Sequence, residues 1–184
     1  TVKSLDPEDL KALGASVILS NAYHLYLRPG VDVVQGAGGL HKFMAWPGLI
    51  LTDSGGFQIF SLQKLMKIDD GGVSFRSHVD GSAHSLTPAS AMDVQARLGA
   101  DIAMAFDQCP PSDAPRARVL EAMERTTLWV GQCVTQPRPD HQCRFGIIQG
   151  GLHLDLREQH IQQISALPFD GFALGGLSVG ETPR

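Results

Sequence analysis

Apolar residues gather in five short runs, and a polar residue or a glycine follows closely after each run. Near-continuous apolar runs of this length are typical of strands that are buried on both faces of a parallel sheet. The five runs are Val17–Ser20, Leu49–Thr52, Ile102–Phe106, Phe145–Ile148 and Phe172–Leu174. The pattern therefore predicts five strands of one parallel sheet.

Helical patterns fill most of the segments between these runs. Asp6 followed by Pro7 is typical of a helix start, and Gly14 predicts the end of that helix. Apolar spacing predicts three further helices, over Pro88–Leu98, from Pro115 to about Val134, and over Leu154–Leu167. In the last of these we expect the core-facing residues to be Leu154, Ile161, Ile164 and Leu167.

A different pattern follows the second predicted strand. Asp80-Gly81 lies between two alternating segments, which is a strong signal for a β-hairpin. We expect this hairpin to be a small antiparallel insertion in a fold that otherwise alternates strands and helices. Such alternation is typical of an α/β fold with parallel strands.

Two α/β architectures fit this alternation, namely an open doubly wound sheet and a (β/α)8 TIM barrel. Polar groups or glycines follow all five predicted strands, and these are Asn21, Asp53, Asp107, Gln149 and Gly175-Gly176. Functional groups from many strand ends meet at one mouth in a barrel, whereas an open sheet concentrates them at one switch point. We therefore predict that residues 1–184 form an incomplete (β/α)8 barrel with about five of its eight strands.

Composition narrows the class of protein. The chain is 43% hydrophobic and 18% charged, which is ordinary for a soluble globular protein. No apolar run approaches the ~18 residues that a membrane span needs. Three unpatterned cysteines favour a reducing, cytoplasmic setting and offer no recognisable zinc spacing. The net charge of −4, taken alone, argues against a nucleic-acid partner.

The strand-end carboxylates are the first candidates for chemistry. Asp53 could be a helix cap, but two glycines after it would let a ligand approach the backbone, and Phe57 could stack on a flat ring. Asp107 repeats the pattern, and two acids in one mouth are less readily explained as caps. Gln149 could bind the edge of a heterocycle or could bond to nearby backbone.

Two further features are more ambiguous. The segment Gly175–Gly180 could be a phosphate cradle or a bare backbone surface for a flat ligand. Cys109 could be a reactive thiol, yet no histidine lies nearby in the sequence to activate it.

Six segments in this order resemble the tRNA-guanine transglycosylase, or queuine tRNA-ribosyltransferase, family. They are "SNAYHLYLRPG", "LTDSGGFQIFSL", "HVDGS", "FDQC", "GIIQGG" and "ALGGLSVGE". The resemblance covers nearly the whole chain and implies a (β/α)8 barrel. It also implies exchange of guanine at the wobble position of tRNAs with a GUN anticodon for a 7-deazaguanine. That exchange passes through a covalent aspartyl-ribose intermediate in queuosine biosynthesis.

The resemblance also implies roles for individual residues. Asp53 resembles the acid/base carboxylate, and Phe57 takes the stacking position of the base. Asp107 resembles the acceptor for the pyrimidine edge of guanine, while Gln149 and the N–H of Gly176 resemble the groups that read O6. The base-binding loop would comprise Ser54, Gly55 and Gly56.

The remaining site residues surround these groups. Asn21 is placed to orient Asp53, which is our own hypothesis. Cys109 and Val179 resemble the bacterial branch, whose incoming base is preQ1 rather than queuine, and Leu177 belongs to the same substrate-binding loop.

The same resemblance implies that several parts of the enzyme lie outside these 184 residues. These parts are the first barrel strand, the nucleophilic aspartate, and a zinc site built from C-x-C-x2-C and a later histidine. The basic surface for tRNA would also lie there, which would account for the acidic charge. We expect a homodimer, and we expect that this chain alone cannot complete the exchange.

Two other functions remain open at this point. An unrelated barrel lyase could bind phosphate at Gly175-Gly176, but it would want a lysine at a strand end, and none of the five ends has one. A non-catalytic subunit that resembles the transglycosylase is the other alternative.

Overall fold

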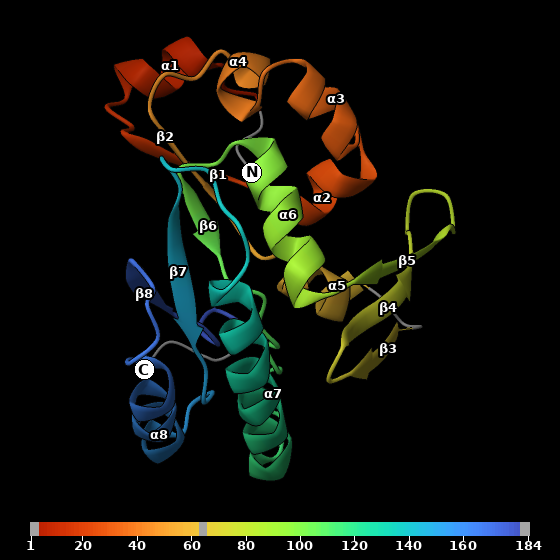
Figure 1. The fold of residues 1–184 in the computed structure, drawn as a ribbon, viewed down its shortest axis with the longest axis vertical. Coiled ribbons are helices and arrows are strands. Elements are labelled where there is room, and N and C mark those ends of the chain that lie inside the picture. The colour runs from red at the N-terminus through yellow and green to blue at the C-terminus, as the bar shows by residue number, and fades with distance from the viewer. Residues whose placement is uncertain (1–3, 63–65, 181–184) are drawn as a thin grey trace.

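The computed structural model describes residues 4–62 and 66–180, and a parallel sheet runs through the centre of the molecule (Figure 1). Its strands are β1 (Val17–Ser20), β2 (Leu49–Thr52), β6 (Ile102–Met104), β7 (Cys143–Ile148) and β8 (Gly171–Leu174). The strands lie in the order β1-β2-β6-β7-β8, and every neighbouring pair is parallel. All five strands predicted from the sequence are confirmed, with shifts of one or two residues at some ends.

The sheet is open within the described part of the chain. β1 and β8 are its two edges, and no pairing joins them among the described residues. The structure therefore supports an α/β fold with a parallel sheet and a separate antiparallel sheet, and it shows no closed barrel. Within the parallel sheet the strands lie in space in the same order in which they occur along the chain, which is the order that a barrel requires.

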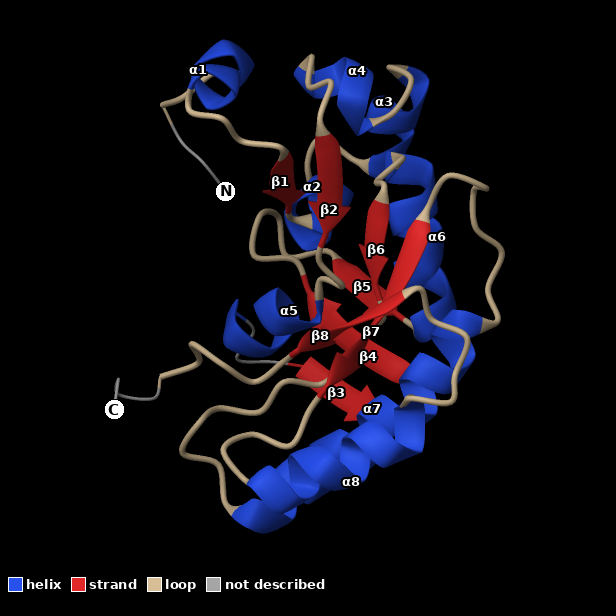
Figure 2. Cartoon of the chain, turned by 90° about the vertical axis from the view of Figure 1, so that its left-hand side faces the viewer, coloured by secondary structure: helices blue, strands red, loops and turns tan. Residues whose placement is uncertain are grey.

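Three helices cover one face of the parallel sheet (Figure 2). They are α6 (Pro88–Leu98), α7 (Arg116–Val134) and α8 (Leu154–Ile164). Thr87 caps α6 in a capping box, and Gly99 ends it in the left-handed conformation at φ 74°. The predicted bounds of α6 are confirmed, and the bounds of α7 differ by one residue.

The prediction for α8 is partly wrong. The helix ends at Ile164 rather than Leu167, and its buried residues are Leu156, His160 and Ile164. Leu154 is 75% exposed and Ile161 is 41% exposed. Contacts with β7 and α7 fix how the helix is rotated, and that rotation buries a histidine in place of two apolar residues.

The first helix, α1 (Pro7–Ala12), begins as predicted. The Asp6 carboxylate accepts a hydrogen bond from Asp9 N–H, and the Asp9 carboxylate accepts one from Asp6 N–H. Four short helices were not predicted, namely α2 (Ala22–Leu27), α3 (Val31–Gly36), α4 (Leu40–Met44) and α5 (Gly56–Leu62). They have five to seven residues each, which is too short for a periodic apolar pattern to emerge.

The predicted hairpin is part of a three-stranded antiparallel sheet. β4 (Gly72–Arg76) and β5 (Ala83–Leu86) form the hairpin, and β3 (Met66–Asp69) adds a third strand that the sequence analysis missed. Two hydrogen bonds attach this sheet to α2: Tyr23 Oη lies 2.9 Å from His78 Nδ1, and Tyr26 Oη lies 3.0 Å from His84 Nδ1.

The main core lies between the parallel sheet and its helices. Phe106 stacks on Trp129 with their ring centroids 4.7 Å apart, and both side chains are fully buried. The opposite face of β1 and β2 is different, since Val17, Leu19 and Leu49 are between 45% and 52% exposed. The expectation that these strands are buried on both faces is therefore wrong within the described residues, because the helices cover only one face.

Candidate active site

A cavity of about 390 Å³ lies along the C-terminal ends of the parallel strands. Asp53, Asp107 and Gln149 line it, and each follows a different strand of the sheet. Parallel strands end at the same edge, so residues far apart in sequence meet there. The structure thus brings together the strand-end groups that the sequence places in one mouth.

Asp53 is held at the start of α2. Its Oδ1 accepts a hydrogen bond of 2.8 Å from Ala22 N–H, and its Oδ2 accepts one from the Asn21 side-chain amide. Burial raises the pKa of Asp53 to about 6, against the pull of the Ala22 and Gly55 N–H groups. The negative charge of Asp107 raises it further. A carboxyl with this pKa exchanges protons readily near neutral pH.

Asp107 is buried more deeply than Asp53. It accepts a hydrogen bond of 2.9 Å from Ser54 Oγ at one oxygen and one of 2.7 Å from Gln149 Nε2 at the other. Burial raises its pKa, while these two donors act in the opposite direction. Since a carboxylate has about four acceptor sites, lone pairs remain on both oxygens for the N–H groups of a ligand.

The amide of Gln149 lies directly against the glycine pair after β8. A Cβ at Gly175 would lie 2.5 Å from Gln149 Nε2, and one at Gly176 would lie 3.0 Å from its Oε1. Gly176 also has a φ of 67°, which favours glycine. Gln149 Oε1 is buried with no hydrogen-bond partner among the described residues. The pair of glycines therefore lets a bare backbone approach the amide.

The other predicted site residues divide into two groups. Ser54, Phe57, Cys109, Leu177 and Val179 line the same cavity. Gly55 and Gly56 do not line it but pack beside it.

Close packing accounts for both of these glycines. A Cβ at Gly56 would lie 2.6 Å from the Asp107 carbonyl oxygen. Gly55 faces Tyr23 with a φ of 78°, which favours glycine.

Cys109 is not suited to nucleophilic chemistry. Burial and the charge of Asp107 raise the pKa of its thiol to about 11, so it stays protonated at neutral pH.

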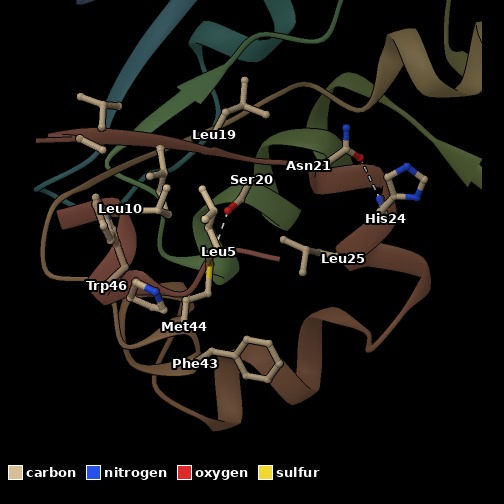
Figure 3. Close-up of a pocket in the computed structure, with 14 residues that line it drawn as sticks. Leu5, Leu10, Leu19, Ser20, Asn21, His24, Leu25, Phe43, Met44 and Trp46 are labelled. Atoms are coloured by element: carbon tan, nitrogen blue, oxygen red, sulfur yellow. Dashed lines mark hydrogen bonds between the residues drawn. The ribbon is translucent and has the colours of Figure 1, made fainter. Parts of the chain in front are cut away.

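Asn21 acts on the cavity through Asp53. Its Oδ1 accepts a hydrogen bond of 3.0 Å from His24 N–H, so one amide caps α2 and also donates to the carboxylate. Figure 3 shows Asn21 at the rim of a neighbouring, larger pocket. That pocket, of about 600 Å³, is lined mainly by apolar side chains such as Leu5, Leu10 and Phe43. It lacks the carboxylates that make the first cavity a candidate for chemistry.

Sequence reasoning missed several residues of the site. The apolar floor of the cavity comes from side chains on one face of the strands, namely Leu19, Leu51, Met104 and Ile147. The alternation of side chains along each strand predicts that these residues share one face. The face was missed because the continuous apolar runs indicate strands that are buried on both faces. Two residues of α8, Arg157 and His160, contact the backbone of the site and were also missed.

Two other properties of the described residues bear on function. No cluster of three or more His, Cys, Asp or Glu side chains within them could hold a metal ion. The described residues therefore do not offer a ligand set for the zinc that the resemblance implies. Separately, no helix in the described ranges has both the length and the apolar character to cross a membrane.

The fold and the site define an α/β protein with paired carboxylates at the C-terminal edge of a parallel sheet. Comparison with known families identifies it further. The chain belongs to the queuine tRNA-ribosyltransferase family, whose model matches residues 1–184.

Curated relatives agree with this assignment. A queuine tRNA-ribosyltransferase from Dehalococcoides mccartyi is 56% identical over 181 residues, which are 98% of this chain and 46% of that protein. A protein of the same name from Pelotomaculum thermopropionicum is 55% identical over 98% of this chain and 49% of that protein. Another, from Symbiobacterium thermophilum, is 56% identical over 98% of this chain and 46% of that protein. The chain therefore spans about half the length of the curated relatives it matches.

Proposed function

We propose that this chain is the base-binding part of a tRNA-guanine transglycosylase. The enzyme would exchange guanine at the wobble position of GUN tRNAs for preQ1 in queuosine biosynthesis. The observation that carries this proposal is the meeting of Asp53, Asp107 and Gln149 in one cavity, beside the bare backbone of Gly175-Gly176. Family membership and relatives named queuine tRNA-ribosyltransferase support it.

The donors and acceptors of the cavity match the edge of guanine. Guanine presents N–H donors on its pyrimidine edge and the O6 acceptor beside them. Asp107 would accept from the N–H groups, while the Gln149 amide and Gly176 N–H would donate to O6. Phe57 is 45% exposed at the cavity wall and would stack on the ring. A base bound in this way must leave the anticodon stack.

Asp53 would carry the protons of the exchange. With a pKa of about 6 it is mostly ionised at pH 7, and roughly one tenth of it is protonated. It would give a proton to the leaving guanine, so that guanine departs as a neutral base and not as an anion, which is a poor leaving group. It would then take a proton from the incoming base. Asn21 would hold the carboxylate in place between these steps.

The side chains of Cys109, Leu177 and Val179 would surround the ring substituent that distinguishes preQ1 from guanine. Burial keeps Cys109 as a neutral thiol there. We further propose that the five strands belong to a (β/α)8 barrel and that residues 1–184 are an incomplete catalytic domain. The nucleophilic aspartate and the zinc ligands would lie outside them. The proposal includes a homodimer that acts in the cytoplasm.

The test is incorporation of labelled guanine into unmodified tRNA that carries G34. It should be run on the full-length protein, on this 184-residue chain, and on full-length Asp53→Asn and Asp107→Asn variants. We expect exchange by the full-length protein and none by the 184-residue chain or Asp53→Asn. Exchange by the short chain would place the nucleophile within it and would make the division of roles wrong. No exchange by the full-length protein would favour a non-catalytic subunit.

A further inference from the structure

Helix α8 contacts the backbone of the site through two side chains on one of its faces. His160 and Arg157 are three residues apart, so they lie one above the other on the helix surface. Neither lines the cavity itself. His160 reaches a backbone group of the loop after β7, and Arg157 reaches backbone groups of the loops after β7 and β8.

His160 satisfies the backbone N–H of Gln149. The ring is fully buried, and its Nδ1 lies 2.8 Å from Gln149 N. An amide N–H only donates, so Nδ1 is the bare nitrogen and the ring proton is on Nε2. Gln149 is the first residue beyond the end of β7, where the strand no longer pairs, so a side chain takes over as the acceptor.

This hydrogen bond fixes the residue whose side chain faces Asp107. The Gln149 amide donates to Asp107 over 2.7 Å, so a shift of the Gln149 backbone would move the amide away from the base edge. Burial lowers the pKa of His160 to about 4, which keeps the ring neutral and able to accept at neutral pH. No charged neighbour contributes to that shift among the described residues.

Arg157 ties together the loops after β7 and β8. Its Nε donates to the Gly151 carbonyl over 2.7 Å, and its Nη2 donates to the Gly175 carbonyl over 2.8 Å. In a trans peptide the carbonyl and the next N–H point in opposite directions. Holding the Gly175 carbonyl toward Arg157 therefore turns the Gly176 N–H away from Arg157, to the side of Cys109, which lines the cavity.

We propose that His160 and Arg157 are positioning residues that hold Gln149 and the Gly175–Gly176 peptide in the geometry that reads the base. The inference rests on the proposed function, since it assumes that these groups bind a purine edge. Neither residue touches the reacting atoms. Their effect should appear in the binding of the base and not in the binding of tRNA.

The experiment compares substitutions in the full-length protein. His160→Leu removes the acceptor and keeps the volume apolar, while His160→Asn returns an acceptor oxygen near the position of Nδ1. Arg157→Met removes the link between the loops. Ile164→Ala is the matched control, because Ile164 is fully buried on the same helix and is not among the residues that line the cavity.

We expect His160→Leu and Arg157→Met each to raise the KM for guanine by about 5- to 100-fold, the range set by an unsatisfied buried polar group. The Kd for tRNA should stay unchanged, and His160→Asn should recover most of the loss. Ile164→Ala should lower Tm without changing the KM for guanine. An equal rise in KM for Ile164→Ala, at a similar loss of Tm, would mean general packing and would overturn the proposal. So would a wild-type KM in both His160→Leu and Arg157→Met.

A second readout does not depend on activity. Nitrogen-15 NMR of the wild-type protein should show His160 as the neutral tautomer with its proton on Nε2. A proton on Nδ1 at neutral pH would overturn the assignment, whether or not the protein exchanges bases. If the wild-type protein exchanges no base but shows the expected tautomer, the proposed function fails and the role of His160 in holding Gln149 stands. The KM comparison is then replaced by calorimetric binding of guanine to the same variants.

Discussion

The raised pKa of Asp53 should make the protein less stable as the pH rises, and Asp53→Asn should remove that dependence. An ordinary aspartate titrates at 3.8, whereas burial moves Asp53 in the folded protein to about 6. Between these two values the folded protein binds a proton that the unfolded chain has released. Stability that is fully present below the lower value is therefore lost as pH rises through the upper one.

The size of the effect follows from the two pKa values. At 1.36 kcal/mol per pH unit, the difference between 3.8 and about 6 corresponds to about 3 kcal/mol. Most of this loss, about 2 to 3 kcal/mol, falls between pH 4 and pH 7.5. Asp53→Asn has no such titration, so the free energy of unfolding of the variant minus that of the wild type should rise by this amount over that interval.

Urea denaturation of both proteins at several pH values between 4 and 7.5 measures the difference. Asp107 is also buried and is present in both proteins, so its own burial is common to both curves, and only its charge coupling to Asp53 enters the difference. The hydrogen bonds that an asparagine keeps or loses with Asn21 and Ala22 shift the whole curve and leave its slope unchanged. Parallel curves for the two proteins would refute the reasoning, because they would mean that Asp53 titrates in the folded state as it does in the unfolded chain.

The remaining predictions concern other parts of the site and its surroundings. Asp107→Asn should raise the KM for guanine about 10- to 100-fold in the exchange assay, since hydrogen bonds to a charged group are worth ~1.5–3 kcal/mol and an amide also presents a donor to Gln149. Gly56→Ala should lower the free energy of unfolding by about 1–3 kcal/mol, because its Cβ would lie 2.6 Å from a carbonyl oxygen. Gly131→Ala in α7, where nothing lies within 4 Å of a Cβ, should instead raise it by roughly 0.5–1 kcal/mol, and thermal denaturation of both variants compares the two. A thiol reagent at pH 8 should react first with the exposed Cys143, and a fast phase that persists in Cys143→Ala would contradict the partial burial of Cys109 and the burial of Cys133.

The sequence alone determined much of the secondary structure. Asp6, Gly99 and the five apolar runs act through contacts with residues close to them in the chain, so their signals can be interpreted without the fold. The order of the strand-end motifs can also be interpreted without the fold, and it indicated the family that the comparison then identified. Short-range signals fail where an element is shorter than the window of about 11–18 residues in which a helical period can be recognised, as for α2 to α5.

Only the tertiary structure decided how these pieces act together. The pKa of Asp53 depends on burial and on Asp107, which reaches it from another strand, and no local pattern encodes that distance. His160 carries no local signal in the sequence, and only the packing of α8 places its ring against Gln149. Apolar periodicity shows that a strand or helix has a buried side, but the neighbours that cover that side come from elsewhere in the chain. For this reason the sequence identified the strand-end groups, while their protonation and their supporting contacts emerged only from the packed fold.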